Sequence, residues 1–138
     1  MAAADALLDA GMLVGFLDKA DQWHGFALAA VTRIRFPAFT CEAVLSEAAY
    51  HLRGLQPARL ALLEMVDSGA LVVLPIFPDG AAYISSAAAR YGAKADLADL
   101  GLLWLAEARP SVTIFTTDSR DFRRYRLARG RVPKVDAP

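Results

Sequence analysis

The sequence predicts an α/β fold, in which helices cover both faces of a mostly parallel sheet. Short apolar runs suited to buried strands alternate with longer segments whose apolar residues recur at helical spacing. Such alternation implies right-handed crossovers between parallel strands. With 138 residues, the chain is expected to form one domain over residues 1–138, large enough to bury a core without disulfides.

Four apolar runs are interpreted as strands. ALVVLPIF at residues 70–77 is continuous and rich in β-branched residues, as is typical of a strand buried on both faces. The others are ALLDAG, FPAFT and SVTIFTT, at residues 6–11, 36–40 and 111–117. A strand in the closing segment GRVPKVDAP is expected to be short or missing.

Helices are expected between these runs. The helix that begins near Pro57 has proline at its start and Gly69 after its end, which is the usual asymmetry. LVGFL continues as a helix after Gly11, and the other helical segments are residues 21–34, 42–52, 79–91, 96–108 and 121–127.

Composition narrows the class of protein. Although 56% of the residues are hydrophobic, no apolar run approaches the ~20 residues of a membrane span. The N-terminus MAAADALLDAG lacks the basic start and uninterrupted apolar segment of a signal peptide, so a cytoplasmic location is expected. The single cysteine, Cys41, cannot form an internal disulfide, and the sequence has no Cys/His cluster of the kind that binds zinc.

Charge is balanced overall but uneven along the chain. Net charge is zero, with 15 basic and 15 acidic residues, so the chain as a whole is not expected to attract nucleic acid. From Asp118 onward basic residues predominate, among them Arg120, Arg123 and Arg124. This basic end either meets phosphates or forms a solvated helix whose last turn favours positive charge, and the sequence leaves both interpretations open.

Two of the predicted strands end at an acid. In an open α/β sheet the functional site lies beyond the carboxyl ends of the strands. Asp9 follows the first predicted strand, and Asp118 follows the last clear one. The nucleotide-binding patterns GxGxxG and GxxxxGK[ST] are absent from the sequence, as is the GxSxG pattern of serine hydrolases. The carboxylates are therefore the candidate functional groups.

Four acids recur in apolar surroundings, namely Asp9, Glu47, Asp99 and Asp118. Burying a carboxylate is unfavourable unless positive charge neutralises it, and no basic residue adjoins Asp9, Glu47 or Asp99 in the sequence. Carboxylates that converge without basic partners suit a hard cation such as Mg²⁺ or Mn²⁺. One or two such ions can activate water for phosphodiester hydrolysis.

Each acid also has a purely structural interpretation. Asp96 suits the N-cap of a helix, with Asp99 at the capping-box position three residues later. Asp118 could likewise cap a helix, and Asp9 could be a turn residue. Glu47 is the hardest to explain in this way, because its neighbours in the predicted helix are apolar.

Glu42 competes with Glu47 as a metal ligand. The two are five residues apart in one predicted helix. At ~100° per residue their side chains point roughly 140° apart, so both cannot easily face one ion. Glu47 is therefore preferred.

Four segments follow one another in a specific order: LLDAGMLVGFLDKADQWH, CEAVLSEAAYHL, DLADLGLLWLAEA and TIFTTDSRDFRRYR. Together, over residues 7–126, they resemble the PIN-domain family, in its branch of VapC-type toxins from toxin–antitoxin pairs. The resemblance implies a compact, PIN-like three-layer α/β/α sandwich. It also implies a metal-dependent ribonuclease that uses Mg²⁺ or Mn²⁺, with its acids clustered at one end of the sheet.

Carried over residue by residue, the resemblance assigns the catalytic, metal-binding acids to Asp9, Glu47, Asp99 and Asp118. Asp96 matches a position that is often acidic in this branch, and we expect it to cap the helix or hold a water molecule beside the ion. Asp121 is expected to be structural, and His24 to be a surface or packing residue rather than a catalytic base. The candidates for contact with the RNA backbone are Arg120, Arg123 and Arg124.

The resemblance also implies partners. The expected substrate is single-stranded or structured RNA, and the expected partners are a small antitoxin protein and a second copy of the chain. The apolar helices over 21–34 and 57–66 could supply these interfaces, although core packing explains their pattern equally well.

Two other classes of protein compete with a nuclease. A HAD-like phosphatase needs a second Asp two residues after the first, where Gly11 stands. A non-catalytic PIN-like protein-binding module remains open, but such a module has no physical need to keep buried acids.

Overall fold

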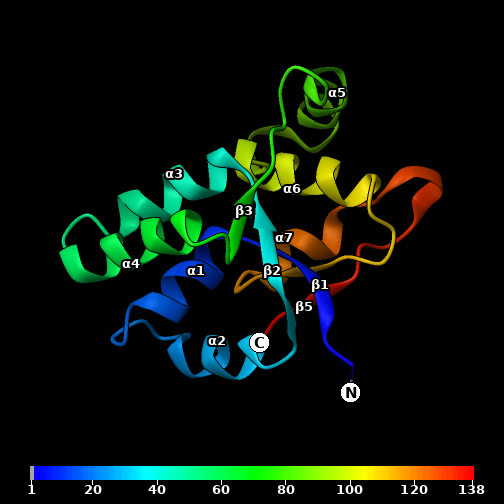
Figure 1. Ribbon diagram of the computed structural model, residues 1–138. Coiled ribbons are helices and arrows are strands. Elements are labelled where there is room, and N and C mark those ends of the chain that lie inside the picture. Colours follow the sequence, from blue (N-terminus) through cyan, green and yellow to red (C-terminus); the bar gives the residue numbers. More distant parts are fainter. Residues whose placement is uncertain (1) are drawn as a thin grey trace.

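The computed structural model describes residues 2–138, and it confirms the predicted α/β/α fold (Figure 1). Over these residues one sheet has the strand order β3-β2-β1-β4-β5, and every neighbouring pair runs parallel. The strands are β1 (Ala4–Leu8), β2 (Ile34–Thr40), β3 (Leu71–Val73), β4 (Thr113–Phe115) and β5 (Val135–Asp136).

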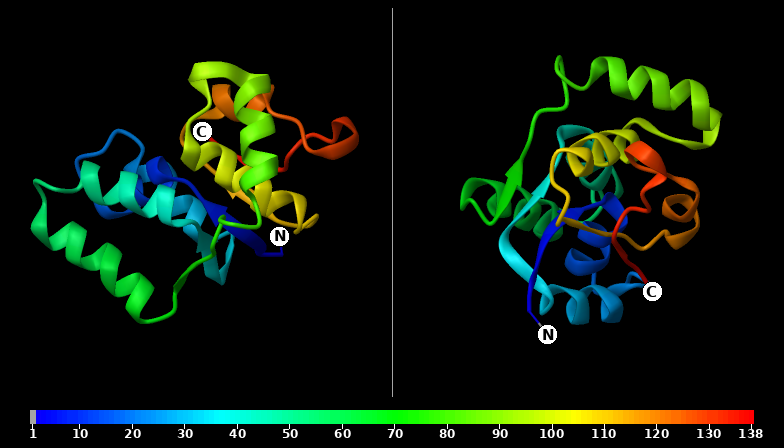
Figure 2. Two further views of the ribbon diagram at one scale, coloured as in Figure 1. Left: turned by 90° about the horizontal axis from the view of Figure 1, so that it is seen from above. Right: turned by 90° about the vertical axis from the view of Figure 1, so that its right-hand side faces the viewer.

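Helices cover both faces of this sheet. The chain first steps from β1 through β2 to β3, and then returns to β4 and β5 on the other side of β1. Because crossovers are right-handed, this reversal sends the first four helices and the last three to opposite faces (Figure 2). They are α1 (Ala10–Leu17), α2 (His24–Val31), α3 (Glu42–His51), α4 (Gln56–Asp67), α5 (Ala81–Tyr91), α6 (Leu97–Glu107) and α7 (Ser119–Arg124).

The core is built around β1, β4 and α6. Leu7 in β1, Ile114 in β4 and Leu103 in α6 are fully buried. α6 also allows a close helix approach, because a Cβ on Gly101 would lie 3.0 Å from Ile76 Cδ1 and 3.1 Å from the Sγ of the buried, free Cys41. Gly101 thus lets α6 lie close to the segments that follow β2 and β3.

Several predicted elements are shorter in the structure. β3 stops at Val73 rather than continuing to residue 77, because Pro75 has no N–H to extend the ladder. α2 starts at His24 rather than at residue 21, since the Asp21 side chain accepts a hydrogen bond from the Trp23 N–H at 2.9 Å and makes a turn there. α7 spans Ser119–Arg124 rather than 121–127.

The last strand does form, but over two residues only, and it pairs parallel with β4. None of the described helices is both long and apolar enough to cross a membrane.

Gly80 precedes α5 in a space that has no room for a side chain. A Cβ there would overlap the backbone oxygen of Ile76 and lie 2.8 Å from the ring of Trp104. We therefore expect Gly80→Ala to lower the free energy of unfolding by about 1–3 kcal/mol, as measured by urea denaturation. Gly25→Ala in α2 is the control, because nothing lies within 4 Å of its Cβ and alanine favours a helix. Equal losses in both variants would contradict the packing argument.

Candidate active site

The site lies where the strand order reverses. From the adjacent carboxyl ends of β1 and β4, the chain leaves toward opposite faces through α1 and α7. Such a switch point leaves a crevice beyond the strand ends. The register pairs Leu8 with Phe115, which places Asp9 beside Thr116. A pocket of about 340 Å³ opens at this point.

Acidic side chains dominate this pocket, which we call the acid pocket. No Lys or Arg from the described part of the chain is among its lining residues. The four acids predicted as ligands come to it from the β1–α1 junction, α3, α6 and the β4–α7 junction, whereas Glu42 lines a separate apolar pocket beside Phe77. The seven carboxylates of the acid pocket belong to Asp9, Asp21, Glu47, Asp96, Asp99, Asp118 and Asp121.

Asp9 is buried at the junction of β1 and α1, where it caps the helix. Its Oδ1 accepts a hydrogen bond from the Met12 N–H at 2.8 Å, and its Oδ2 accepts one from the Thr116 hydroxyl. Burial raises the pKa of Asp9 to about 7, helped by the charges of Glu47 and Asp118 and opposed by the two hydrogen bonds. Asp9 is therefore an N-cap as well as a carboxylate of the pocket.

Asp96 and Asp99, at the start of α6, have different roles. Asp96 is the N-cap, and its Oδ1 accepts a hydrogen bond from the Asp99 N–H at 2.8 Å. Asp99 is free of capping, and its Oδ2 accepts a hydrogen bond from the Tyr125 hydroxyl at 2.8 Å. Burial raises the pKa of Asp99 to about 7, and the neighbouring charges of Asp96, Asp121 and Asp9 act in the same direction.

The acids after β4 belong to the start of α7. Asp118 is the N-cap, with its Oδ1 accepting from the Asp121 N–H at 3.3 Å. Its own N–H donates to the Thr116 hydroxyl oxygen at 2.9 Å, so Thr116 connects Asp118 to Asp9. Asp121 forms an ion pair with Arg124 at 3.5 Å. Burial and the adjacent Asp118 raise the pKa of Asp121, while Arg124 lowers it.

Glu47 extends toward the same pocket from α3. Burial and the charge of Asp96 raise its pKa, while His51 opposes the shift. His51 also lines the pocket and was not singled out in the sequence. Its spacing of four residues from Glu47 places both on one helix face, and that spacing is the signal that could have found it.

Other residues of the site had weaker signals in the sequence. Asp21 and Trp23 line the pocket from the α1–α2 connection. His24, by contrast, is not among the lining residues, and its Nδ1 donates to the Gly15 carbonyl at 2.7 Å. Tyr125 carried no signal at all, because its hydroxyl reaches Asp99 only through the tertiary fold.

The donor set fits a hard divalent cation in its chemistry. All the candidate ligands are carboxylate oxygens, which Mg²⁺ and Mn²⁺ prefer. Burial first, and neighbouring carboxylates second, raise the pKa values of Asp9 and Asp99, and a bound cation would oppose both effects. Yet within residues 2–138 no three acidic, His or Cys side chains are arranged so that they could hold one ion as they stand. The carboxylates therefore match a divalent cation in ligand type and charge, but they do not form a preformed coordination site.

These pKa shifts predict that the metal-free protein loses stability as pH rises. In the folded state Asp9 and Asp99 release their protons near pH 7, whereas ordinary aspartates do so near 3.8. The folded state therefore holds more protons between these values, and the stabilisation present below about pH 4 is lost as pH passes through about 7.

Asp99→Asn removes one of the two charges while keeping an oxygen for the Tyr125 hydroxyl. In EDTA near pH 8 we expect it to raise the free energy of unfolding by about 1–3 kcal/mol, with a smaller gain near pH 5. Denaturant melts at the two pH values test this, with Asp79→Asn, exposed before α5, as the control. A pH-independent effect would contradict the electrostatic origin.

Comparisons with known proteins agree with this architecture. The family model of the PIN domain matches residues 6–127. The chain is similar in structure to Mycobacterium tuberculosis VapC20, described as a toxin that cleaves the sarcin–ricin loop, with 14% identity and a TM-score of 0.75 over 84% of this chain and 92% of that one. DNA-bound VapBC from Salmonella typhimurium matches with 18% identity and a TM-score of 0.59, over 97% and 98% of the two chains.

VapBC2 from Rickettsia felis, bound to a DNA fragment from its promoter, matches with 14% identity and a TM-score of 0.62, over 96% and 98% of the two chains. A search of curated proteins gave no significant match. At these identities the solved structures show the fold alone, whereas the family model covers most of the sequence. The chain therefore belongs to the PIN-domain family.

Proposed function

We propose that the protein is a metal-dependent ribonuclease that hydrolyses RNA phosphodiester bonds, and that it is the toxin of a toxin–antitoxin pair. One observation carries the proposal: seven carboxylates line one pocket at the switch point of the sheet, with no Lys or Arg among the described residues that line it. Membership of the PIN-domain family supports a nuclease. The likeness to VapC20, whose description names cleavage of the sarcin–ricin loop, supports RNA as the substrate.

The acids that would hold one or two Mg²⁺ or Mn²⁺ ions are Asp9, Glu47, Asp99 and Asp118. A bound ion supplies a Lewis acid, which lowers the pKa of water and offsets charge on the phosphate oxygens. Thr116 holds the Asp9 carboxylate, and Tyr125 holds that of Asp99, each through a hydroxyl donor. Asp96 fixes the start of α6 and so the direction of Asp99.

The RNA backbone would run over the arginines of α7. Arg120 and Arg123 are exposed, and Arg124 is half-buried beside Asp121 at the rim of the acid pocket. Phosphates near these side chains would gain charge-assisted contacts next to the carboxylates. RNA binding should accordingly weaken as salt concentration rises.

Cleavage of a mixed set of single-stranded RNAs tests the activity. We expect wild type to cut with Mg²⁺ or Mn²⁺ and not with EDTA, and Asp99→Asn to be at least about 100-fold slower. Asp79→Asn, which lies outside the pocket lining, should cut as wild type does. Cleavage that survives EDTA or Asp99→Asn would reject the metal-dependent mechanism.

Metal binding has a readout that does not need the RNA target. Mn²⁺ should raise the melting temperature of wild type near pH 8, because an ion that binds only the folded state at 100 times its Kd adds about 2.7 kcal/mol. The double variant Asp9→Asn, Asp99→Asn should lose most of this shift. If Mn²⁺ leaves wild type unchanged and no RNA is cut, the non-catalytic protein-binding module becomes the better description.

We also propose a small antitoxin protein and a second copy of the chain as partners. The VapBC structures similar to this chain support an antitoxin. α2 and α4 expose leucines that a lone molecule leaves in water, with Leu28 48%, Leu60 54% and Leu63 48% exposed. Light scattering of the chain alone, and of the chain co-expressed with a small protein encoded beside it, separates the two associations.

A further inference from the structure

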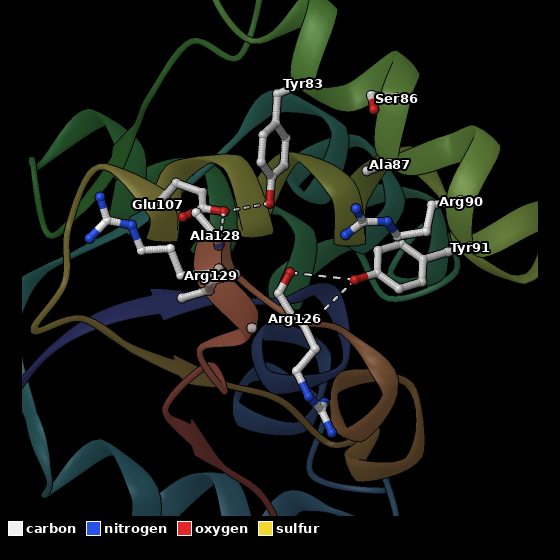
Figure 3. A pocket seen from close by; sticks show the side chains of 11 residues that line it. Tyr83, Ser86, Ala87, Arg90, Tyr91, Glu107, Arg126, Ala128 and Arg129 are labelled. Atoms are coloured by element: carbon white, nitrogen blue, oxygen red, sulfur yellow. Dashed lines mark hydrogen bonds between the residues drawn. The ribbon is translucent and has the colours of Figure 1, made fainter.

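A second pocket, of about 520 Å³, lies between α5, the end of α6 and residues 126–130 (Figure 3). Its walls carry arginine and tyrosine side chains, so we call it the arginine–tyrosine pocket. Tyr83 points from α5 toward Glu107, and Tyr91 reaches the backbone of Arg126 on the opposite wall. Arg90 and Arg129 also line it, and neither belongs to the acid pocket.

The pocket carries positive charge that the fold leaves uncompensated. Among the described residues that line it, the one carboxylate is that of Glu107. This carboxylate is already engaged: Oε2 accepts from the Tyr83 hydroxyl at 3.1 Å and from the Ala128 N–H at 2.8 Å, and Oε1 pairs with Arg131 at 3.0 Å. In contrast, no carboxylate within residues 2–138 forms an ion pair with the three arginines that line the pocket, Arg90, Arg126 and Arg129.

This combination selects a ligand with both an anionic group and a flat ring. Arginine guanidinium groups bind phosphate oxygens, and tyrosine rings stack on nucleobases. A volume of about 520 Å³ lies within the range of small-molecule sites and admits one nucleotide rather than a long stretch of backbone. A nucleotide satisfies both requirements.

The arginine–tyrosine pocket is connected to the acid pocket. The Tyr91 and Tyr125 rings meet edge to face with centroids 4.9 Å apart, and the Tyr125 hydroxyl holds Asp99. On the outside, the exposed side chains of Arg123 and Arg126 follow one another from α7 to the second pocket. An RNA strand that leaves the acid pocket over α7 therefore meets positive charge along its path.

We propose that the arginine–tyrosine pocket binds a nucleotide of the RNA strand flanking the cleaved phosphodiester, with Arg90 and Arg129 on opposite sides of the pocket for the phosphates on either side of that nucleotide and a tyrosine ring for its base. This inference rests on the proposed ribonuclease function. The inference adds a second binding site, distant from the carboxylates, and this second site would contribute to the choice of RNA target.

Fluorescence anisotropy of a labelled single-stranded RNA tests this site in the Asp99→Asn background, which is expected to keep RNA intact during the measurement. In that background we compare Arg90→Gln and Arg129→Asn with Arg35→Gln as the control. Arg129 has φ 61°, a conformation that asparagine tolerates, so this change removes charge with little backbone strain. Arg35 lies in β2, is exposed and pairs with Asp5 away from both pockets.

Each pocket variant should weaken RNA binding at least about fivefold. Each should also make the negative slope of the logarithm of the association constant against the logarithm of salt concentration shallower by about 0.7, whereas Arg35→Gln should change neither quantity. Equal binding by all variants would overturn the subsite, even if wild type cleaves RNA. Loss of binding in the pocket variants supports the subsite, even if wild type cuts nothing and the nuclease proposal fails. Tight binding of a free mononucleotide, with RNA binding unaffected by the variants, would reject RNA as the occupant.

Discussion

The buried carboxylate of Asp9 is the constraint on which the rest of the site depends. One of its oxygens caps α1 through Met12, and the other holds Thr116 at the end of β4. Thr116 in turn accepts from Asp118 at the start of α7. A single carboxyl group thus joins the two helices that leave the switch point toward opposite faces. Its raised pKa shows that this position opposes ionisation, and an uncharged cap would be more favourable for folding alone.

A carboxylate is likewise held in an unfavourable environment at the start of α6. Here the structural acid and the candidate functional acid are two different residues. Asp96 already satisfies the helix start, so the fold gives Asp99 no capping task. Asp99 is nevertheless held among acids in the pocket, where burial and then its acidic neighbours raise its pKa. Capping accounts for Asp96 and gives Asp99 no role at the helix start; its one side-chain hydrogen bond among the described residues is from the Tyr125 hydroxyl. Natural proteins concentrate such conflicts between stability and local environment at functional sites.

Much of this arrangement could be predicted because its signals are local. An acid directly after an apolar strand, as at Asp9 and Asp118, shows its place at the sheet edge in the sequence itself. Glu47 could be identified because its neighbours in the sequence are apolar. The helical angle between the side chains of Glu42 and Glu47 indicated that they point in different directions, and in the structure they line different pockets. Alternating patterns were likewise enough for the parallel sheet, although not for the end of β3.

What could not be predicted depends on contacts between distant segments. Tyr125 looks like any residue of a basic C-terminal segment until the fold packs its ring against Tyr91 and Phe122 and its hydroxyl against Asp99. The distribution of charge in space could not be predicted either, because the net charge of the chain is zero. In the folded structure, carboxylates lie together at the strand ends, whereas arginines lie along α7 and in the arginine–tyrosine pocket. Segregation of this sort lets a neutral protein attract phosphates beside a cluster of carboxylates that would, without a cation, repel them.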